Sequence, residues 1–236
     1  MIIETVIKKI CAAGFAFLMI FTGVANADST ILFAGADARE ESDVGYAGLT
    51  YYFNEDILAD GFLIRAVASR ANYEYKTNFG ETDADVIGSE LMVGYQKVWD
   101  SFTARGLIGL DYEDHDFSPD NIFDDNRGSD TGVKVRAEVE TDFSSPDYAS
   151  LLVSYGSAKE RYWARLRGGR EFSGLVVGPE LIFLGDQEYD EQRLGAFLMV
   201  KKLVPVSFTV SAGYADPDTD RGDSGPYLAL EVSKTF

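Results

Sequence analysis

The sequence predicts an all-β protein: an antiparallel up-and-down transmembrane β-barrel of about twelve strands that follows a cleaved signal peptide. Three observations lead to this fold class. The chain starts with an export signal, apolar and polar residues alternate in one segment after another, and the last residue, Phe236, is aromatic. In a membrane barrel successive side chains face lipid and lumen in turn, so every strand carries this two-residue period.

Residues 1–27 have the pattern of a secretory signal peptide. Lys8 and Lys9 precede an apolar run over residues 12–24, and the small residues 25–27 close the segment. The run holds roughly 13 residues, fewer than the roughly 20 that a helix needs to span a bilayer. We therefore predict cleavage after Ala27, with residues 28–236 forming the barrel.

The mature chain is strongly acidic and contains no cysteine. Cys11, Lys8, Lys9 and Glu4 leave with the signal segment, so the net charge of −18 becomes −19 after the loss of two positive charges and one negative charge. Such a charge argues against nucleic acid as a partner. Disulfides cannot contribute to stability, and no mature segment has 18 consecutive apolar residues, so a membrane could be crossed only by strands.

Alternation is clearest in residues 132–143, where Val133, Val135, Ala137 and Val139 are separated by charged residues. Twelve such segments are predicted, near residues 29–39, 43–54, 61–77, 84–99, 101–113, 131–143, 147–157, 161–172, 174–185, 191–203, 206–215 and 225–236. Ten or fourteen strands, or a secreted β-sandwich, are the alternatives. A change of phase near Ser69 predicts a bulge there.

The connections between these segments alternate in length, as expected for periplasmic turns and outer loops. Short turns are predicted at residues 100–101, 144–146, 173 and 204–205, and longer acidic loops at 114–130, 185–190 and 216–222. Aromatic residues at the strand ends predict two interfacial girdles. The short-turn girdle would hold Phe53, Phe62, Trp99, Phe102, Phe143, Phe172 and Phe208, and the outer girdle Tyr73, Tyr75, Tyr112, Tyr155, Tyr162, Trp163 and Tyr214.

The predicted register points many charged side chains into the lumen. They are Arg65, Glu90, Arg105, Asp111, Lys134, Arg136, Glu138, Glu140, Arg165, Arg167, Glu180, Arg193 and Glu231. Mixed signs favour mutual pairing in a cross-linked interior, because an unpaired ion away from water is costly. The alternative is a selectivity lining or a sugar-binding track, with Tyr162 and Trp163 as stacking platforms near the outer mouth.

Two further patterns concern metal binding and catalysis. Asp216, Asp218 and Asp220 are followed by Gly222, which is one position late for a calcium loop. Only weak binding of divalent cations by the acidic outer loops, bridging to lipopolysaccharide phosphates, is considered, and no metal or cofactor is assigned. His115 is the only histidine, and it lies with Ser118 in a predicted acidic loop. A lipid-modifying enzyme would need these groups on rigid strands, so this function is the less favoured alternative.

Several stretches of the mature chain resemble the cellulose biosynthesis protein BcsS family of Gram-negative bacteria. They are residues 61–65 (GFLIR), 127–134 (RGSDTGVK), 162–165 (YWAR), 178–180 (GPE) and 192–195 (QRLG). The resemblance implies a role in bacterial cellulose production or export, and it supplies no active-site residues.

The physical pattern limits what that role can be. An exported chain without cytoplasmic glycosyltransferase motifs is not the synthase, and no helical repeats accompany the barrel. We expect a non-catalytic accessory protein of the outer membrane, in contact with lipid, lipopolysaccharide and cellulose or its secretion machinery. A small-solute pore and a barrel-embedded lipid-modifying enzyme are the alternatives.

Overall fold

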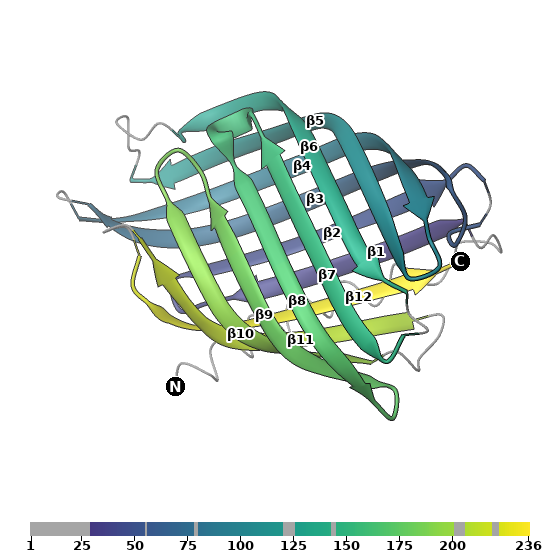
Figure 1. Cartoon of the computed structure of the whole chain (residues 1–236). Coiled ribbons are helices and arrows are strands. Elements are labelled where there is room, and N and C mark those ends of the chain that lie inside the picture. Colours follow the sequence, from purple (N-terminus) through teal and green to yellow (C-terminus); the bar gives the residue numbers. More distant parts are fainter. Residues whose placement is uncertain are drawn as a thin grey trace.

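The structure is a computed structural model that describes residues 29–54, 56–77, 80–119, 126–142, 145–200, 206–218 and 222–236. Twelve antiparallel strands form one closed barrel in which each strand pairs with its neighbours in the chain and β1 pairs with β12 (Figure 1). The strands are β1 (Thr30–Ala38), β2 (Ser42–Tyr52), β3 (Gly61–Thr77), β4 (Gly80–Val98), β5 (Phe102–Ser118), β6 (Gly128–Thr141), β7 (Asp147–Gly156), β8 (Tyr162–Phe172), β9 (Leu175–Gly185), β10 (Asp190–Val200), β11 (Val206–Pro217) and β12 (Gly225–Thr235). The predicted fold class and strand number are confirmed.

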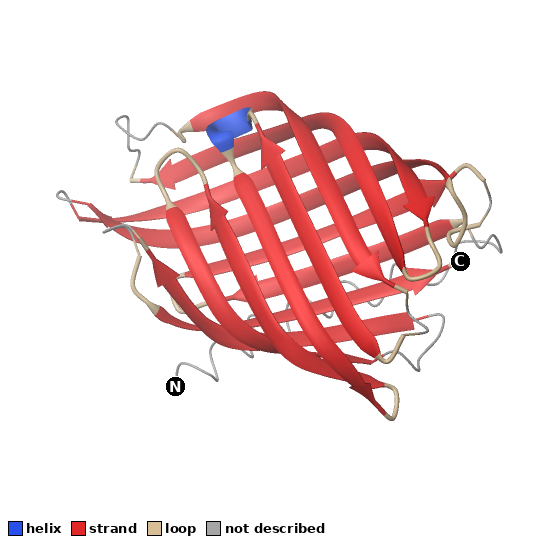
Figure 2. Ribbon diagram, in the orientation of Figure 1, coloured by secondary structure: helices blue, strands red, loops and turns tan. Residues whose placement is uncertain are grey.

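Closure of the barrel satisfies the backbone at the seam between the first and last strands. Thr30 and Phe236 exchange two backbone hydrogen bonds, with N···O distances of 3.1 and 2.9 Å. Because lipid offers no hydrogen-bonding groups, only a closed sheet can expose strands to hydrocarbon. Figure 2 shows strand around the whole wall, with the 3₁₀ helix η2 (Ala158–Glu160) between β7 and β8.

One end of the barrel carries the C-terminus and a two-residue turn, at the right of Figure 1. This turn joins β8 to β9 through Ser173 and Gly174, whose φ angles of 55° and 88° suit a two-residue hairpin. Short turns and the chain ends lie on the periplasmic side of bacterial barrels, so we assign this end to the periplasm. The connection between β2 and β3 is an exception to the predicted pattern, since β2 ends at Tyr52 and β3 starts only at Gly61.

The opposite, outer end is extended by β3, β4 and β5, which contain 17, 19 and 17 residues. The predicted loop over residues 114–130 is wrong in its extent, because β5 continues to Ser118 and β6 starts at Gly128. The connection between β3 and β4 is also short, since these long strands approach each other at Thr77 and Gly80. After Tyr112 the outward residues Asp114, Asp116 and Ser118 are polar, so no lipid-facing pattern distinguishes strand from loop there.

The outward face is apolar between two aromatic levels. On β5, the outward residues from Phe102 to Tyr112 cover ten residue steps, or about 25 Å along the membrane normal at a rise of about 3.3 Å and a tilt near 40°. Ile108 and Leu110 within this span are 53% and 59% exposed on the isolated chain. This height matches the apolar band of outer-membrane barrels, and Asp114 follows Tyr112 beyond it.

The outer girdle is smaller than predicted. Tyr112, Tyr155 and Tyr214 are exposed and face outward. Tyr73, Tyr75 and Trp163 face the interior: Tyr75 is 5% exposed, the Tyr73 hydroxyl lies 3.4 Å from His115 Nδ1, and Trp163 shares the face of Arg165 on β8. Phe143 lies outside the described residues. The phase of β3 explains the first two residues, because its pairing runs without interruption from Leu63 to Tyr73 with β2 and from Gly61 to Thr77 with β4, and contains no bulge at Ser69.

Close strand approach requires glycine at position 178. A Cβ built on Gly178 would lie 1.8 Å from the carbonyl oxygen of Gly168, on the neighbouring strand β8.

Among the described residues, no helix has both the length and the apolar character to cross a membrane.

Candidate functional site

The barrel interior is crossed by ion pairs between strands that are not neighbours in the sheet. Side chains on such strands can meet only through the interior. Pairs of this kind join Arg65 to Glu138, Lys134 to Glu90, Arg165 and Arg167 to Glu231, and Arg193 to Asp37. Apart from Asp111, the charged residues expected in the lumen therefore form ion pairs in the structure.

The first network surrounds Glu138 of β6. Its carboxylate accepts hydrogen bonds from Arg65 and from Arg136 Nε at 2.6 Å, while Arg105 Nη1 lies 3.6 Å away. The Glu138 side chain is 13% exposed. Arg65 also donates to Thr50 Oγ1 at 3.0 Å, and Arg105 donates to Glu140 Oε1 at 2.7 Å. One carboxylate therefore holds three guanidinium groups from β3, β5 and β6 together.

The second network lies on β8 to β12. Glu231 accepts from Arg165 and from Arg167 Nη2, the latter at 2.9 Å. Glu180, which is 1% exposed, accepts from Arg167 and from the Tyr227 hydroxyl at 3.0 Å. Low exposure on both partners means that each charge depends on the other for its stabilisation.

Apolar clusters fill the interior closer to the periplasmic end. One contains Tyr52, Leu63, Met92 and Leu107, and the other contains Tyr148, Val176, Phe197 and Met199. The loop between β2 and β3 packs Ile57 against the first cluster, and the carbonyls of Ile57 and Ala59 accept from Gln96 Nε2 at 2.8 and 3.0 Å. Gln96 is 0% exposed. This part of the interior is therefore packed like a protein core.

At the outer end, the turn between β9 and β10 contacts two other connections. Asp186 Oδ1 accepts from Asn126 Nδ2 at 3.0 Å, and Gln187 N donates to the carbonyl of Lys159 at 3.2 Å. Arg161 lies 3.9 Å from Asp186. Burial raises the pKa of the Asp186 carboxyl, although the hydrogen bond from Asn126 and the charge of Arg161 act in the opposite direction.

A second group of contacts ties the β1–β2 connection to β10. Arg39 pairs with Glu191 and donates to the carbonyl of Asp223 at 2.7 Å, while Arg193 Nη1 lies 2.6 Å from Asp37 Oδ2. Burial also raises the pKa of the Tyr189 hydroxyl, the Arg39 charge opposing it. Arg39, Asp37 and Glu191 were not predicted as interior residues. Glu191 shares the two-residue period of Arg193, which is the signal that could have identified it.

His115 lies on strand β5 and faces the interior, which corrects its predicted place on a loop. Its side chain is fully buried, with Nε2 3.2 Å from Glu113 Oε2, and Arg161 Nη1 lies 3.0 Å from Glu113 Oε1. Ser118 is at the end of the same strand on the outward face. The two residues considered for a catalytic pair therefore point to opposite sides of the wall.

Asp111 is the least satisfied charge among the described residues. It is 2% exposed, and neither carboxylate oxygen has a hydrogen-bond partner. Glu90 lies directly opposite on β4, and it has one bonded oxygen, to Lys134 Nζ at 2.5 Å, and one unbonded oxygen. A Cβ on Gly156 would lie 2.2 Å from Asp111 Oδ2. A side chain at position 156 would therefore displace this carboxylate.

Tyr162 and Trp163 point to opposite faces of β8 and cannot form one platform. The Tyr162 hydroxyl donates to Asp190 Oδ1 at 2.6 Å outside the wall, whereas Trp163 faces inward. Glycan stacking on either ring stays a prediction.

No group of three or more His, Cys, Asp or Glu side chains placed to hold a metal ion occurs within the described ranges. Asp216 accepts from Ser224 Oγ at 2.5 Å, and Asp220 lies outside those ranges.

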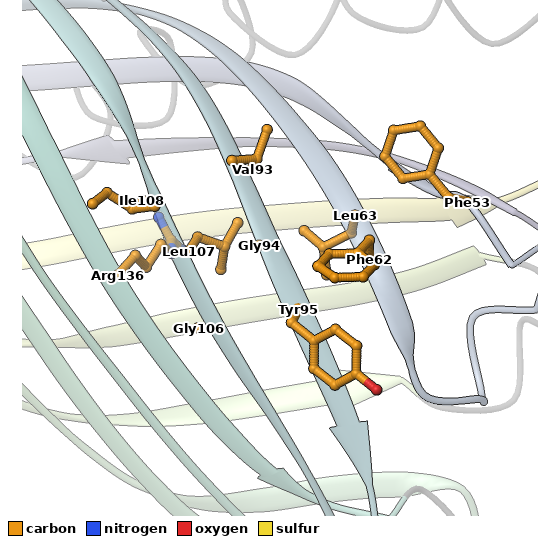
Figure 3. Close-up of a pocket in the computed structure, with 10 residues that line it drawn as sticks. All are labelled: Phe53, Phe62, Leu63, Val93, Gly94, Tyr95, Gly106, Leu107, Ile108 and Arg136. Carbon is orange, nitrogen blue, oxygen red and sulfur yellow. The ribbon is translucent and has the colours of Figure 1, made fainter.

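A pocket of about 790 Å³ lies in the wall of β3, β4 and β5 near the periplasmic end (Figure 3). Its rim is formed by exposed outward side chains, among them Phe62, Val93 and Tyr95, and its floor by the backbone around Gly94 and Gly106. No feature of the sequence analysis predicted this pocket, because it depends on which residues adjoin across three strands.

The closed antiparallel sheet, its apolar outward band and its polar paired interior define an outer-membrane β-barrel protein. The chain belongs to the cellulose biosynthesis protein BcsS family, whose family model matches residues 31–236. Membership associates the protein with cellulose biosynthesis and confirms the resemblance drawn from the sequence.

Solved structures of outer-membrane barrels resemble the fold. LpxR from Salmonella typhimurium has a TM-score of 0.52 at 13% identity, covering 88% of this chain and 100% of that chain. The β domain of the Bordetella autotransporter BrkA has a TM-score of 0.51 at 13% identity, covering 88% and 99%. A KdgM porin follows at 0.48 and 8% identity, covering 87% and 99%. Likeness at such identities shows the fold alone. Comparison with curated proteins gave no match.

Proposed function

We propose that this protein is a non-catalytic accessory barrel of the outer membrane that supports the secretion or surface organisation of cellulose, and that its lumen does not conduct. The observation that carries the proposal is the pair of buried ion networks around Glu138 and Glu231. They bring side chains from both halves of the wall into the space that a pore would need. The apolar clusters next to them occupy the periplasmic half of the interior.

A filled interior suits a scaffold better than a passage. A barrel of this size falls between eight-stranded barrels filled by side chains and sixteen-stranded porins with water-filled channels. Here the carboxylates of the two networks are paired with arginines, so none of them is left to select a passing ion. The outer loops and the projecting strands β3 to β5 then offer the surface for lipopolysaccharide, cellulose or its secretion machinery.

Planar-bilayer recording tests the occluded lumen. The purified protein, with the signal segment removed as we propose, should insert without steady ohmic conductance, whereas a general porin reconstituted in parallel should conduct. Stable, single-sized conductance steps from the barrel would overturn the occluded state and favour the small-solute pore.

Gene deletion tests the cellular role. Loss of the protein should lower cellulose yield, surface attachment or fibre order, and the wild-type gene should restore it. The variants His115→Phe and Ser118→Ala should restore it equally, because the proposed role needs no proton transfer at these positions. A folded variant that fails to complement would favour the enzyme alternative, and an unchanged cellulose phenotype after deletion would contradict the accessory role itself.

A further inference from the structure

The pocket in the outer wall of β3 to β5 has the form of a lipid-chain groove. One side is formed by Phe62 and Tyr95, whose rings meet edge to face at a centroid distance of 5.1 Å. Val93 and Ile108 form the opposite side, and Figure 3 shows these side chains around the strand backbone at Gly94, with Gly106 beside Tyr95. The lining residues are apolar apart from Arg136 of β6, the one charged residue among them.

The recess exists because a side chain is absent from the outward face at one point. Gly106 faces outward, and a Cβ placed on it would have nothing within 4 Å. Its cross-strand neighbour is Tyr95, which is 43% exposed and rises above the missing side chain. The bulky residues Tyr95 and Ile108 thus lie beside a position without a side chain, and its neighbours Ala104 and Ala137 are small as well, which leaves a concave apolar surface rather than a flat one.

The groove lies at the depth of lipid chains. Trp99 and Phe102 stack at a centroid distance of 4.5 Å where β4 and β5 meet the periplasmic turn, and aromatic rings mark the membrane interface. Tyr95 and Gly106 are each four residues from these rings. At a rise of about 3.3 Å and a tilt near 40°, four residues place the groove about 10 Å inside the interface.

Lys97 supplies a charge at the matching headgroup level. It faces outward between Tyr95 and Trp99, its side chain is 48% exposed, and its Nζ lies 6.0 Å from the Trp99 ring centroid. Asp60 occupies one of the three ammonium donors and also accepts from Val98 N at 2.8 Å. The remaining donors of Lys97 are available for a phosphate oxygen.

We propose that this groove binds one acyl chain of a glycerophospholipid from the periplasmic leaflet, with the lipid phosphate at Lys97. The occupant must be apolar where it touches Gly106 and anionic about 5 Å nearer the periplasm, at the level of Lys97, which is two residues from Tyr95, and a phospholipid joins these two properties. Van der Waals packing, and not the exclusion of water, must hold the acyl chain, because the lipid chains that compete for the groove at this depth are also hydrocarbon. The inference is independent of the proposed role in cellulose secretion.

Native mass spectrometry of the mature barrel in detergent, titrated with dioleoylphosphatidylglycerol, tests the proposal. The wild type should retain one lipid per barrel. Gly106→Leu fills the groove and should weaken retention about tenfold, equivalent to about 1.4 kcal/mol. Val93→Phe narrows the groove from its rim and should act in the same direction. Lys97→Gln should weaken the retention of phosphatidylglycerol. The retention of dioleoylglycerol, the uncharged analogue, should stay unchanged.

The matched control is Ala196→Leu, which adds the same side chain on the outward face of β10, away from the groove. Its lipid retention should equal that of the wild type. Heat-modified migration on gels checks that each variant is folded. Equal retention by folded Gly106→Leu, folded Val93→Phe and the wild type would overturn the proposal, as would equal losses in Gly106→Leu and Ala196→Leu, since both results describe non-specific boundary lipid only.

Discussion

Replacing Glu138 with Gln should be among the most damaging single changes in the barrel interior. The carboxylate contacts guanidinium groups of Arg65, Arg105 and Arg136, and all four side chains are 21% exposed or less. Glutamine keeps the shape and one acceptor oxygen but removes the charge. Three buried cations would then face one another, with only Glu140 left beside Arg105.

The size of the effect follows from that change in charge balance. Removing one partner of a buried ion pair costs about 3–5 kcal/mol, because the remaining charge stays desolvated and unpaired. Glu140→Gln is the matched control on the same face of β6. Glu140 contacts Arg105 at 2.7 Å and is 23% exposed, so its loss should cost about 1.5 kcal/mol, the value of one charge-assisted hydrogen bond.

Urea unfolding in phospholipid vesicles, followed by the fluorescence of Trp99 and Trp163, measures both variants. We expect the unfolding free energy of Glu138→Gln to fall at least about 1.5 kcal/mol below that of Glu140→Gln. Adding Arg65→Met to Glu138→Gln should recover part of the loss, since one unpaired charge leaves with it. If the two single variants unfold within about 0.5 kcal/mol of each other, Glu138 does not organise the interior as described.

Three further predictions use the same unfolding assay. Asp111→Asn should stabilise the barrel by about 1 kcal/mol, because the substitution removes a buried charge without a hydrogen-bond partner and its amide can donate to Glu90. Destabilisation would mean that the Asp111 carboxylate has a hydrogen-bond partner when the barrel is in the membrane. Gly178→Ala should lower the unfolding free energy by more than about 2 kcal/mol through its overlap with the Gly168 carbonyl, and a neutral result would disprove the close approach. The raised pKa of Asp186 predicts a contribution to stability that is complete below the usual carboxyl pKa and is lost as pH rises through the raised value. The difference in unfolding free energy between wild type and Asp186→Asn should therefore grow over that pH range. A difference that does not change with pH would contradict this prediction.

Where the strands are short and half-buried, the sequence pattern was sufficient to place them. On β8, Arg165 and Arg167 alternate with Ala164 and Leu166, and this period assigns each side chain to its face without knowledge of any neighbour. The same reasoning failed beyond Tyr112, because strands that project past the membrane need no apolar face. His115 was therefore placed on a loop although it lies on β5.

Partners inside the barrel could not be predicted from alternation. The period shows that Arg65 and Glu138 point inward, but it does not show that they meet, since they are 73 residues apart and three strands apart in the sheet. The pairing depends on strand tilt and barrel radius, which set the heights at which side chains from different strands coincide. The same geometry brings Arg39 to Glu191.

The sequence by itself determined that the chain is a barrel of about twelve strands in the outer membrane, because a lipid-facing wall imposes a two-residue period that is local to each strand. Only the tertiary structure decided that Glu138 collects three arginines, that Asp111 is left without a partner, and that Gly106 opens a groove in the wall. These features arise from the register and closure of the sheet, which place residues side by side that have no relation along the chain.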